Sequence, residues 1–538
     1  MNKIAIKILF ALVLFVGTSC TKGFLDINND PNNPTVVSNG QLLTTAQLNI
    51  MNGLGSGASG ISNACNVFVH QTTQRSRNDS YAFAPGDGSV QNAWESLYAG
   101  GIQNLNIIIR NATTAGNAHY VGIAQIMKAV AFSYMVDVWG NVPFTESGDV
   151  IVNPFPKFDN GDVVYAELIK LLDEGIANLN RPSNVRVGGD DLIYSGNLVR
   201  WRKLAKTWKL KMYNQMRLVQ NVSANVNALI AENDFIGSGE NFELRYGTVS
   251  VPENRNPVFR SDYNADPNNG RLNYISAYFH EILLGNSQLN PIMNGIADPR
   301  IPYYYFNQLS NARPTAQNPV EYRNGNFLSI YFASQGPNQG FDQSSSLTIV
   351  GQYFCGGRFD DGNGVTAAGV SGTSARGDGA LRVLPFYNLL YMRAELAQVG
   401  TSQGEARALF RDAMLASFAE VNRVAANAGT PTITAATINT YVDAVLVKYD
   451  AANAQGKLEL IMTEKWIANF GFGLESYNDY RRTGFPRMYD PNNDGIAFTN
   501  NNRGYPVSFP YAQSEMNLNS NAPTQRVVAQ DKVFWDRD

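Results

Sequence analysis

The chain has 538 residues, of which 44% are hydrophobic and only 16% are charged. This composition is typical of a folded globular protein and excludes an intrinsically disordered one. The formal net charge of −3 excludes the basic surface that nucleic-acid-binding proteins use, so we expect no nucleic-acid partner.

The first segment has the layout of a bacterial export signal. Lys3 and Lys7 precede an apolar run over residues 8–16, which is too short to span a bilayer, and small residues then lead to Cys20. A cysteine at the cleavage point is what lipoprotein processing requires. We therefore expect residues 1–19 to be removed and Cys20 to carry a lipid that anchors the protein to a membrane. The alternative is a plain secretory signal in which this cysteine falls by chance.

Residues 40–235 predict a helical scaffold. Apolar side chains recur every three or four positions over 123–138, which indicates a helix with one buried stripe. Similar stripes follow over 164–179 and 201–216. The last of these segments also carries many Lys and Arg residues, which we expect to face solvent or to pair with acidic neighbours rather than to bind phosphate.

The segment 236–379 differs from its surroundings. It is rich in Gly, Asn, Ser, Pro and Tyr and has no long helical period, so it predicts loops with a few short strands and helices. Long irregular segments inside a compact protein are usually functional. Helical periodicity returns at 385–399, 406–418 and 458–470, as successive helix pairs would produce it.

We therefore predict a mainly α fold, with a tetratricopeptide-like scaffold of helix pairs and a loop-rich, irregular ligand-binding face. No clean repeat of about 34 residues supports the helix-pair interpretation by itself. The predicted organisation is a single domain over 20–538, with helical scaffold at about 40–235 and 380–485 and a loop-rich insert at about 236–379.

The chain holds 26 Tyr and 28 Phe residues together with many Asn and Gly. Rings stack on the apolar faces of sugars while planar amides bind the hydroxyls, although most rings in any protein belong to its core. Binding residues concentrate on exposed loops of a rigid scaffold. For each candidate a purely structural role is the alternative. The candidate ligand contacts are Arg75, Asn78, Asp79, Tyr81, Tyr263, Asn264, Arg271, Tyr353, Phe354, Arg358 and Asp360.

The sequence lacks HExxH, CxxC, GxSxG and P-loop motifs, so we expect a protein that is not an enzyme and needs no cofactor. A glycosidase with two separated carboxylates is the alternative from another class. Asp490, Asn492 and Asp494 match the first ligand positions of a calcium loop, and a plain turn is the alternative.

Two cysteines remain beyond the lipidation site. Cys65 and Cys355 lie far apart in the sequence and do not form a disulfide framework. They either stay free or pair with each other.

Several stretches together resemble one family. They are CTKGFLDINNDPNNPT around Cys20, WESLYAGGIQNLNIII from Trp94, AVAFSYMVDVWGNVPFTES from Ala129, DLIYSGNLVRWRKLAKTWKLKMYNQMRL from Asp191, and EKWIANFGFGLESYNDYRRTGFP from Glu464. On these motifs the chain resembles the SusD/RagB-like outer-membrane lipoproteins of Bacteroidetes, in particular the branch with an FLDINxDPN start and an RRTGFP motif.

The resemblance implies the helical fold above and also a function. Such proteins lie on the cell surface over a SusC-like TonB-dependent outer-membrane transporter, bind a glycan or oligosaccharide, and act as a lid for its uptake. A peptide or another nutrient is the alternative ligand within the family. For Arg481 and Arg482 in the last motif we expect a structural role, with guanidiniums that bind carbonyls at helix ends or the carboxylate of Asp479.

Overall fold

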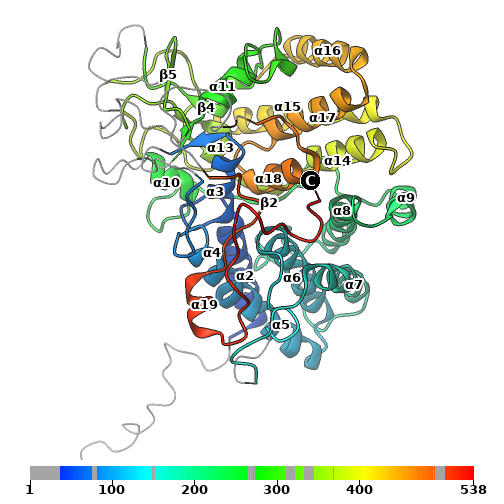
Figure 1. Cartoon of the computed structure of the whole chain (residues 1–538). Helices are drawn as coiled ribbons and strands as arrows, with labels where there is room; N and C mark the ends of the chain where they lie inside the picture. The colour runs from blue at the N-terminus through cyan, green and yellow to red at the C-terminus, as the bar shows by residue number, and fades with distance from the viewer. Residues whose placement is uncertain are drawn as a thin grey trace, which may run out of the picture.

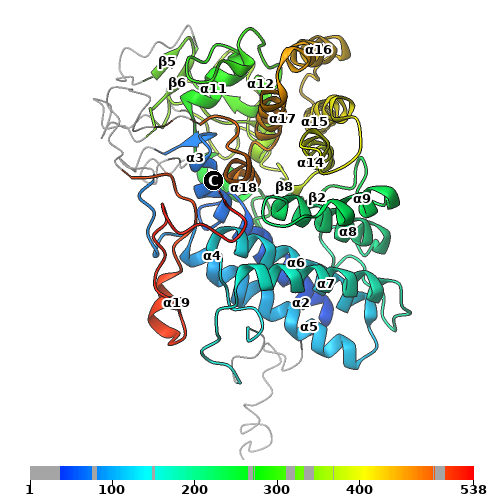
Figure 2. The same ribbon diagram turned by 45° about the vertical axis from the view of Figure 1, so that its right-hand side comes forward.

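A computed structural model describes residues 37–74, 81–147, 152–263, Arg271, 273–310, 322–332, 344–366, 369–488, Asp490 and 503–537. Most of these residues lie in helices, which confirms the mainly α fold class. Long helices form two groups, and short strands and helices gather on one side of the molecule (Figures 1 and 2).

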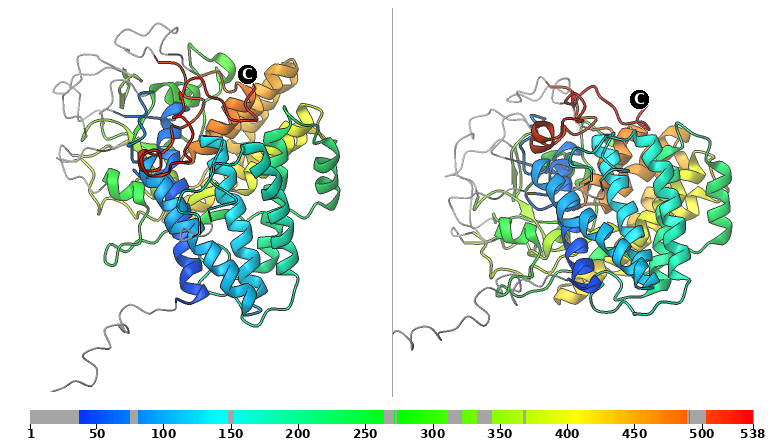
Figure 3. Two further views of the ribbon diagram at one scale, coloured as in Figure 1. Left: turned by 60° about the horizontal axis from the view of Figure 1, so that its bottom comes forward. Right: turned by 90° about the horizontal axis from the view of Figure 1, so that it is seen from below.

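The first group of helices comes from the amino-terminal half of the chain. It comprises α2 (Asn39–Leu54), α3 (Ile61–Phe68), α4 (Gln91–Glu95), the π-helix η1 (Ser96–Ile102), α5 (Gln103–Thr114), α6 (Ala118–Trp139), α7 (Gly161–Leu179), α8 (Leu198–Met216) and α9 (Ser223–Glu232). Helices α2, α5, α7 and α8 all pack against α6, and Figure 3 shows this group from below.

Helix α6 is the core of the first group. Nearly all of its side chains are buried, so the single apolar stripe predicted from the sequence is wrong: the helix is enclosed on all sides. By length and composition it would also pass for a membrane-spanning helix, the only such helix in the described part of the chain. Because 94% of its most apolar window is buried inside the protein, α6 is the core helix of a globular body.

Glycines allow these helices to approach closely. A Cβ added to Gly122 of α6 would lie 2.8 Å from the main-chain oxygen of Gly175 in α7. A Cβ added to Gly100 of η1 would lie 2.4 Å from the side chain of Asn49 in α2. Larger residues at either glycine would therefore force the paired helices apart.

The second group of helices follows the irregular segment. It comprises α14 (Phe386–Gln398), α15 (Ala406–Ala428), α16 (Ala435–Ala451), α17 (Ala454–Ala468) and α18 (Gly473–Thr483). The short α19 (Gln513–Leu518) lies instead beside α4 of the first group, where Ser514 and Gln91 are hydrogen-bonded (Figure 1). Helix α14 packs on α15 and α17, and α16 packs on both of its sequence neighbours. These successive pairs match the predicted helix-pair scaffold. Helix α18 packs on α3 and so joins the two groups.

The irregular side of the molecule is built from very short elements. They are β1 (Thr72–Thr73), α10 (Pro257–Tyr263), β3 (Tyr274–Ile275), α11 (Ala277–Leu284), the 3₁₀ helix η2 (Pro291–Met293), α12 (Ile301–Tyr304), β4 (Tyr305–Phe306), β5 (Tyr322–Asn324), β6 (Phe327–Ser329), β7 (Ile349–Val350) and α13 (Gln352–Cys355). The strands β2 (Phe242–Leu244) and β8 (Leu381–Leu384) lie further in, where the two groups of helices meet (Figure 2).

Antiparallel pairing holds this side together. Strands β1, β3, β7 and β4 form one small sheet in that order, and β5 pairs with β6 as a hairpin. Strand β2 pairs with β8, so that Phe242 lies opposite Leu384. The two ends of the irregular segment are thereby joined at its base.

Cys65 and Cys355 are both buried free thiols. Burial raises the pKa of each thiol above its ordinary value. The structure thus decides between the two alternatives in favour of unpaired cysteines.

Candidate functional site

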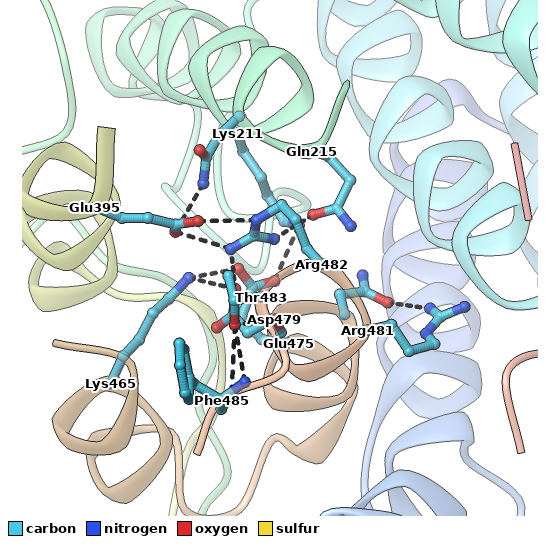
Figure 4. Close-up of polar contacts among 12 residues, drawn as sticks. Lys211, Gln215, Glu395, Lys465, Glu475, Asp479, Arg481, Arg482, Thr483 and Phe485 are labelled. Atoms are coloured by element: carbon cyan, nitrogen blue, oxygen red, sulfur yellow. Dashed lines mark hydrogen bonds and ion pairs between the residues drawn. The ribbon is translucent and has the colours of Figure 1, made fainter. Parts of the chain in front are cut away.

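A buried network of charged side chains joins four helices at the last sequence motif (Figure 4). Arg482 on α18 donates to both carboxylate oxygens of Glu395 on α14, at 2.9 and 2.8 Å. Glu395 also accepts from Arg217, which follows α8, at 2.8 Å. Asp479 accepts from Arg482 at 2.6 Å and from Lys465 of α17 at 2.9 Å. The network, called the ionic cluster below, comprises Lys211, Arg217, Glu395, Lys465, Glu475, Asp479 and Arg482.

The cations of the ionic cluster keep its glutamates charged. Burial alone would raise the pKa of Glu475, but Lys211 and Lys465 outweigh burial and lower that pKa to about 2. In the same way, Arg482 and Arg217 hold the pKa of Glu395 below its ordinary value despite its burial. Each charge in the cluster contacts an opposite charge, so the cluster ties helices together and presents no charge to a ligand.

Arg481 lies beside the ionic cluster and also has a structural role. Its guanidinium donates to the main-chain oxygens of Asp137 and Val507 at 2.7 and 2.8 Å. The same guanidinium lies over the ring of Tyr477, 3.9 Å from the ring centroid. These contacts, with those of Arg482, confirm the structural role predicted for the arginine pair.

Most basic side chains of α8 pair with acidic neighbours, as expected from the sequence. This pairing removes the basis for a phosphate site on the helix. Lys203, Lys206 and Lys209 contact Glu240, Asp234 and Asp173 at 2.9, 2.9 and 2.6 Å, respectively.

Two groups of aromatic rings lie on the irregular side of the molecule and are joined through the chain neighbours Tyr331 and Phe332. The ring centroids of Tyr480 and Tyr505 lie 4.9 Å apart, and those of Tyr505 and Tyr81 lie 5.6 Å apart. The ring of Tyr81 lies 4.8 Å from that of Phe332. These separations are those of favourable aromatic pairs. The aromatic band, as it is called below, comprises Tyr81, Tyr322, Tyr331, Phe332, Tyr480 and Tyr505.

The centre of the aromatic band is buried, and its ends reach solvent. Tyr81 and Phe332 are 3% and 5% exposed. Tyr331 and Tyr322 continue the band with centroids 5.7 Å apart, and these two rings are half-buried. A half-buried ring keeps an apolar face that a sugar ring can cover.

Rigid elements hold the aromatic band in place. Tyr480 lies on α18, two residues before Arg482 of the ionic cluster. His70 supports the centre of the band, because its Nε2 lies 3.2 Å from the hydroxyl of Tyr81 and its ring lies 4.5 Å from that of Phe332. Tyr322 lies on β5 of the hairpin. Side chains fixed in this way bind with little loss of conformational entropy.

Polar groups flank the hairpin end of the aromatic band. Tyr322 hydrogen-bonds the half-buried carboxyl of Glu281, and burial raises the pKa of that carboxyl. Next to it, the ring of His280 stacks on Phe327 at 3.7 Å, and its Nδ1 lies 2.7 Å from the hydroxyl of Tyr305. Burial lowers the pKa of His280 to about 3, so this imidazole is neutral at pH 7. Rings beside neutral and acidic hydrogen-bonding groups suit an uncharged polyhydroxylated ligand.

The structure places Tyr81 in the aromatic band, whereas two other candidate tyrosines lie in the core. Tyr263 is fully buried; its hydroxyl donates to the main-chain oxygen of Val350 at 2.8 Å and accepts from the main-chain nitrogen of Arg358 at 2.9 Å. Tyr353 is fully buried against Tyr387, with 3.1 Å between the two hydroxyls. The expectation that both tyrosines lie on exposed loops is therefore wrong.

The charged candidates of the irregular segment brace main chain and rings. Arg271 is buried and donates to the main-chain oxygens of Asp262 and Val370 at 2.7 and 3.1 Å. The guanidinium of Arg358 lies 4.4 Å from the ring centroid of Phe306. These contacts correct the expectation of an exposed loop for Arg271, and they give Arg358 a structural contact on one face.

The remaining candidates are dispersed. Asp360 is half-buried and accepts from the amide of Asn307 at 2.7 Å. Phe354 is 4% exposed and lines a separate cavity described below. The structure therefore does not bring the candidate ligand contacts together in one site. Cys20, Arg75, Asn78, Asp79, Asn264, Asn492 and Asp494 lie outside the described residues.

Sequence reasoning missed most of the aromatic band. Tyr322 and Tyr331 come from one hairpin, whereas Tyr480 and Tyr505 come from segments far away in the chain, so no local motif joins all four. Three of the four lie within a few residues of a Gly or an Asn–Gly pair, as in YRNGNF and RGYP. Aromatic residues next to turn residues were therefore the available signal.

Among the described residues, no group of His, Cys, Asp or Glu side chains is arranged to hold a metal ion. Asp490 alone of the calcium-loop candidates is described, and it is half-buried. The calcium interpretation stays a prediction.

Comparison with known proteins identifies the family. The sequence matches a SusD-like family model, described as starch-binding and associating with the outer membrane, over residues 31–512. Among curated protein sequences none matches the chain significantly.

Solved structures share the fold over nearly the whole chain. A chitin-binding protein superposes with a TM-score of 0.69 at 20% identity, covering 93% of this chain and 100% of its own. A SusD/RagB family protein from Bacteroides thetaiotaomicron gives 0.67 at 18% identity, covering 93% and 99%. A chitin-binding SusD homolog from Flavobacterium johnsoniae gives 0.62 at 17% identity, covering 92% and 99%. This likeness shows the fold, and the match over residues 31–512 shows that the chain belongs to the SusD-like family, whose model is described as starch-binding and associating with the outer membrane.

Proposed function

We propose that this protein is a lipid-anchored receptor at the cell surface that binds a glycan or oligosaccharide with its aromatic band. It passes the ligand to a SusC-like TonB-dependent transporter in the outer membrane, over which it acts as a lid. The aromatic band is the observation that carries the choice of a glycan, because its half-buried rings offer apolar faces beside hydrogen-bonding groups. Family membership and two chitin-binding structural neighbours support the same ligand class.

The protein binds its ligand and neither makes nor breaks a covalent bond. Sugar rings stack on the band, and groups such as Glu281 orient their hydroxyls. Each contact remains close to solvent, so we expect modest affinity for a single chain. Attachment beside the transporter compensates, because it raises the effective concentration of the ligand at the pore.

A glycosidase would need two carboxylates that flank the scissile bond in an open cleft. Asp298 and Glu464 form one such acidic pair in the described part of the chain, and both bind Arg300, at 2.6 and 2.9 Å. Both carboxylates are buried and closed to a glycan. We therefore propose binding alone, and release of reducing sugar from an oligosaccharide by the purified protein would contradict it.

The first experiment is calorimetric titration of the mature protein with maltohexaose, chitohexaose and a mixed peptide pool. We expect binding of at least one oligosaccharide and a loss of about tenfold in affinity for Tyr505→Ala, since a ring contact contributes roughly 1 to 1.5 kcal/mol. The matched control is Phe155→Ala, which removes a ring that is 50% exposed and outside the band. Binding of peptides alone would favour a peptide-binding protein of the same family. Equal losses of affinity in both variants would contradict the proposal that the aromatic band binds the ligand.

The anchor and the partner need a separate test. Cells that express the native chain should retain it in outer-membrane fractions together with a large β-barrel protein that copurifies after mild detergent extraction. The Cys20→Ala variant should be released into the soluble fraction. Equal membrane retention of the variant would contradict lipid anchoring. Purification of the native protein without a copurifying β-barrel protein would contradict its proposed role as a lid on a transporter.

A further inference from the structure

A second hollow lies away from the aromatic band, where the end of α2 meets the start of α10. This cavity has a volume of about 590 Å³, within the range of small-molecule sites. Its walls come from seven separate stretches of the described chain. The lining side chains that carry the argument are Asn52, Ser56, Tyr246, Asn256, Arg260 and Phe354.

The polar floor of the cavity is fixed before any ligand arrives. Ser56 donates to the main-chain oxygen of Gly471 at 2.7 Å and accepts from Asn66 at 3.2 Å. Asn256 donates to the main-chain oxygen of Gly379 at 2.7 Å and accepts from the main-chain nitrogen of Val258 at 2.8 Å. A floor held in this way loses little entropy on binding.

The same cavity has an apolar wall. Tyr246 is half-buried there, and Phe354 and Leu381 are 4% and 6% exposed. Hydroxyls and amides facing rings and aliphatic groups are the chemistry that a single sugar unit requires. Phe354, predicted from the sequence as a ligand contact, thus lies at this second hollow rather than in the aromatic band.

The charged side chain at the cavity indicates which class of ligand it would bind. Arg260 is the one charged residue among those that line the cavity, and no Asp or Glu is among them. Its side chain is 52% exposed, and its Nε lies 3.9 Å from the nearest carboxylate, that of Glu253. Arg255 already binds both oxygens of Glu253, at 2.8 and 2.7 Å. The guanidinium of Arg260 is therefore available to bind an anion at the mouth of the cavity.

We propose that this cavity is a second glycan subsite, specific for a sugar unit that carries a carboxylate. Arg260 binds the carboxylate, Asn52 and the fixed floor bind hydroxyls, and Tyr246 covers the ring. The inference depends on the proposed glycan-binding function and adds acidic glycans to the ligands of the protein.

The test is titration of the mature full-length protein with sodium D-glucuronate and with D-glucose at constant ionic strength. We expect glucuronate to bind at least tenfold more tightly than glucose. Arg260→Gln should remove this difference, and Asn52→Asp, which adds a negative charge to the wall, should weaken glucuronate alone. The control is Arg411→Gln, which removes an arginine on α15 of similar exposure, 45%, and should leave both affinities unchanged.

Equal binding of glucuronate by Arg260→Gln and Arg411→Gln would overturn the proposed subsite, and so would equal binding of glucose and glucuronate by the wild-type protein. The result for this cavity can be distinguished from the result for the aromatic band. Loss of glucuronate binding in Arg260→Gln with unchanged chitohexaose binding supports two independent sites. Chitohexaose binding without any glucuronate binding leaves the proposed function in place and rejects the acidic subsite.

Discussion

The ionic cluster and the aromatic band share helix α18 but are built in opposite ways. Arg482 is buried and has carboxylates on two sides, whereas Tyr480, two residues earlier, keeps part of its ring in solvent. The first arrangement satisfies every charge internally, and the second leaves apolar surface for an outside partner. The motif that identifies the family therefore serves mainly the scaffold, and the ligand surface lies next to it.

The largest effect should follow from opening the ionic cluster. Glu395→Ala leaves Arg482 and Arg217 without their shared carboxylate in a buried site. We expect the free energy of unfolding to fall by about 3–5 kcal/mol, because uncompensated buried charges are costly. Urea denaturation monitored by far-UV circular dichroism measures this change.

An exposed ion pair provides the control for that experiment. Glu167→Ala breaks the pair with Lys170, whose side chain is 66% exposed, and should leave the urea midpoint unchanged. If Glu395→Ala shifts the midpoint no more than Glu167→Ala does, the ionic cluster does not stabilise the scaffold.

A second substitution tests the packing of the scaffold without touching charge. Gly122→Ala places a Cβ against the main-chain oxygen of Gly175 and should destabilise the protein by about 1–3 kcal/mol. Under conditions in which the variant is fully folded, its glycan affinity should equal the wild-type value, because α6 and α7 lie outside the aromatic band. An unchanged melting temperature would contradict this prediction, because it would show that α6 and α7 can move apart at this contact without loss of stability.

Acid should loosen the two regions in different pH ranges. The pKa of His280, near the band, falls from 6.5 in the unfolded chain to about 3 in the folded protein. Between these values only the unfolded chain takes up the proton, so stability is lost as pH falls from 6.5 towards 3, by about 1.4 kcal/mol per pH unit. The pKa of Glu475 is lowered to about 2, so its stabilisation is present above 4.5 and lost as pH falls from 4.5 towards 2.

Denaturation series at pH 7, 6 and 5 measure the histidine contribution. The wild-type protein should lose more stability over this range than His280→Gln, whose Gln does not titrate. Parallel pH curves for the two proteins would contradict a neutral, buried His280. Glu475 should contribute little over this range, because the whole range lies above its pKa in both the folded and the unfolded state.

Features that depend on interactions between residues close in the sequence could be predicted from the sequence, and features that depend on distant residues could not. The long helices, the turn to irregular structure near 236 and the structural role of Arg482 all follow from local patterns or motifs. The burial of Tyr263 and the aromatic band do not, because they depend on pairs such as Tyr81 with Tyr505 that only the folded chain brings together. Loop composition predicted exposure for Tyr263, yet its hydroxyl bonds main chain in the core.

The smallest expected change in stability, with a clear change in binding, comes from the band itself. Tyr480→Leu keeps an apolar side chain on α18 and should alter the free energy of unfolding by less than about 1 kcal/mol. It should weaken oligosaccharide binding severalfold, because the flat ring face is lost. Calorimetry and denaturation on the same sample separate the two effects, and wild-type affinity in this variant would contradict a role for Tyr480 in stacking.

The central claim is that the ligand covers the aromatic band and leaves the helical scaffold bare. Hydrogen–deuterium exchange of the mature protein with and without chitohexaose or maltohexaose, whichever binds, tests it directly. We predict slower exchange at residues 322–332, at 503–505 and at the end of α18, with no change over α7, α8 and α9. Protection confined to α7, α8 and α9 would contradict the account.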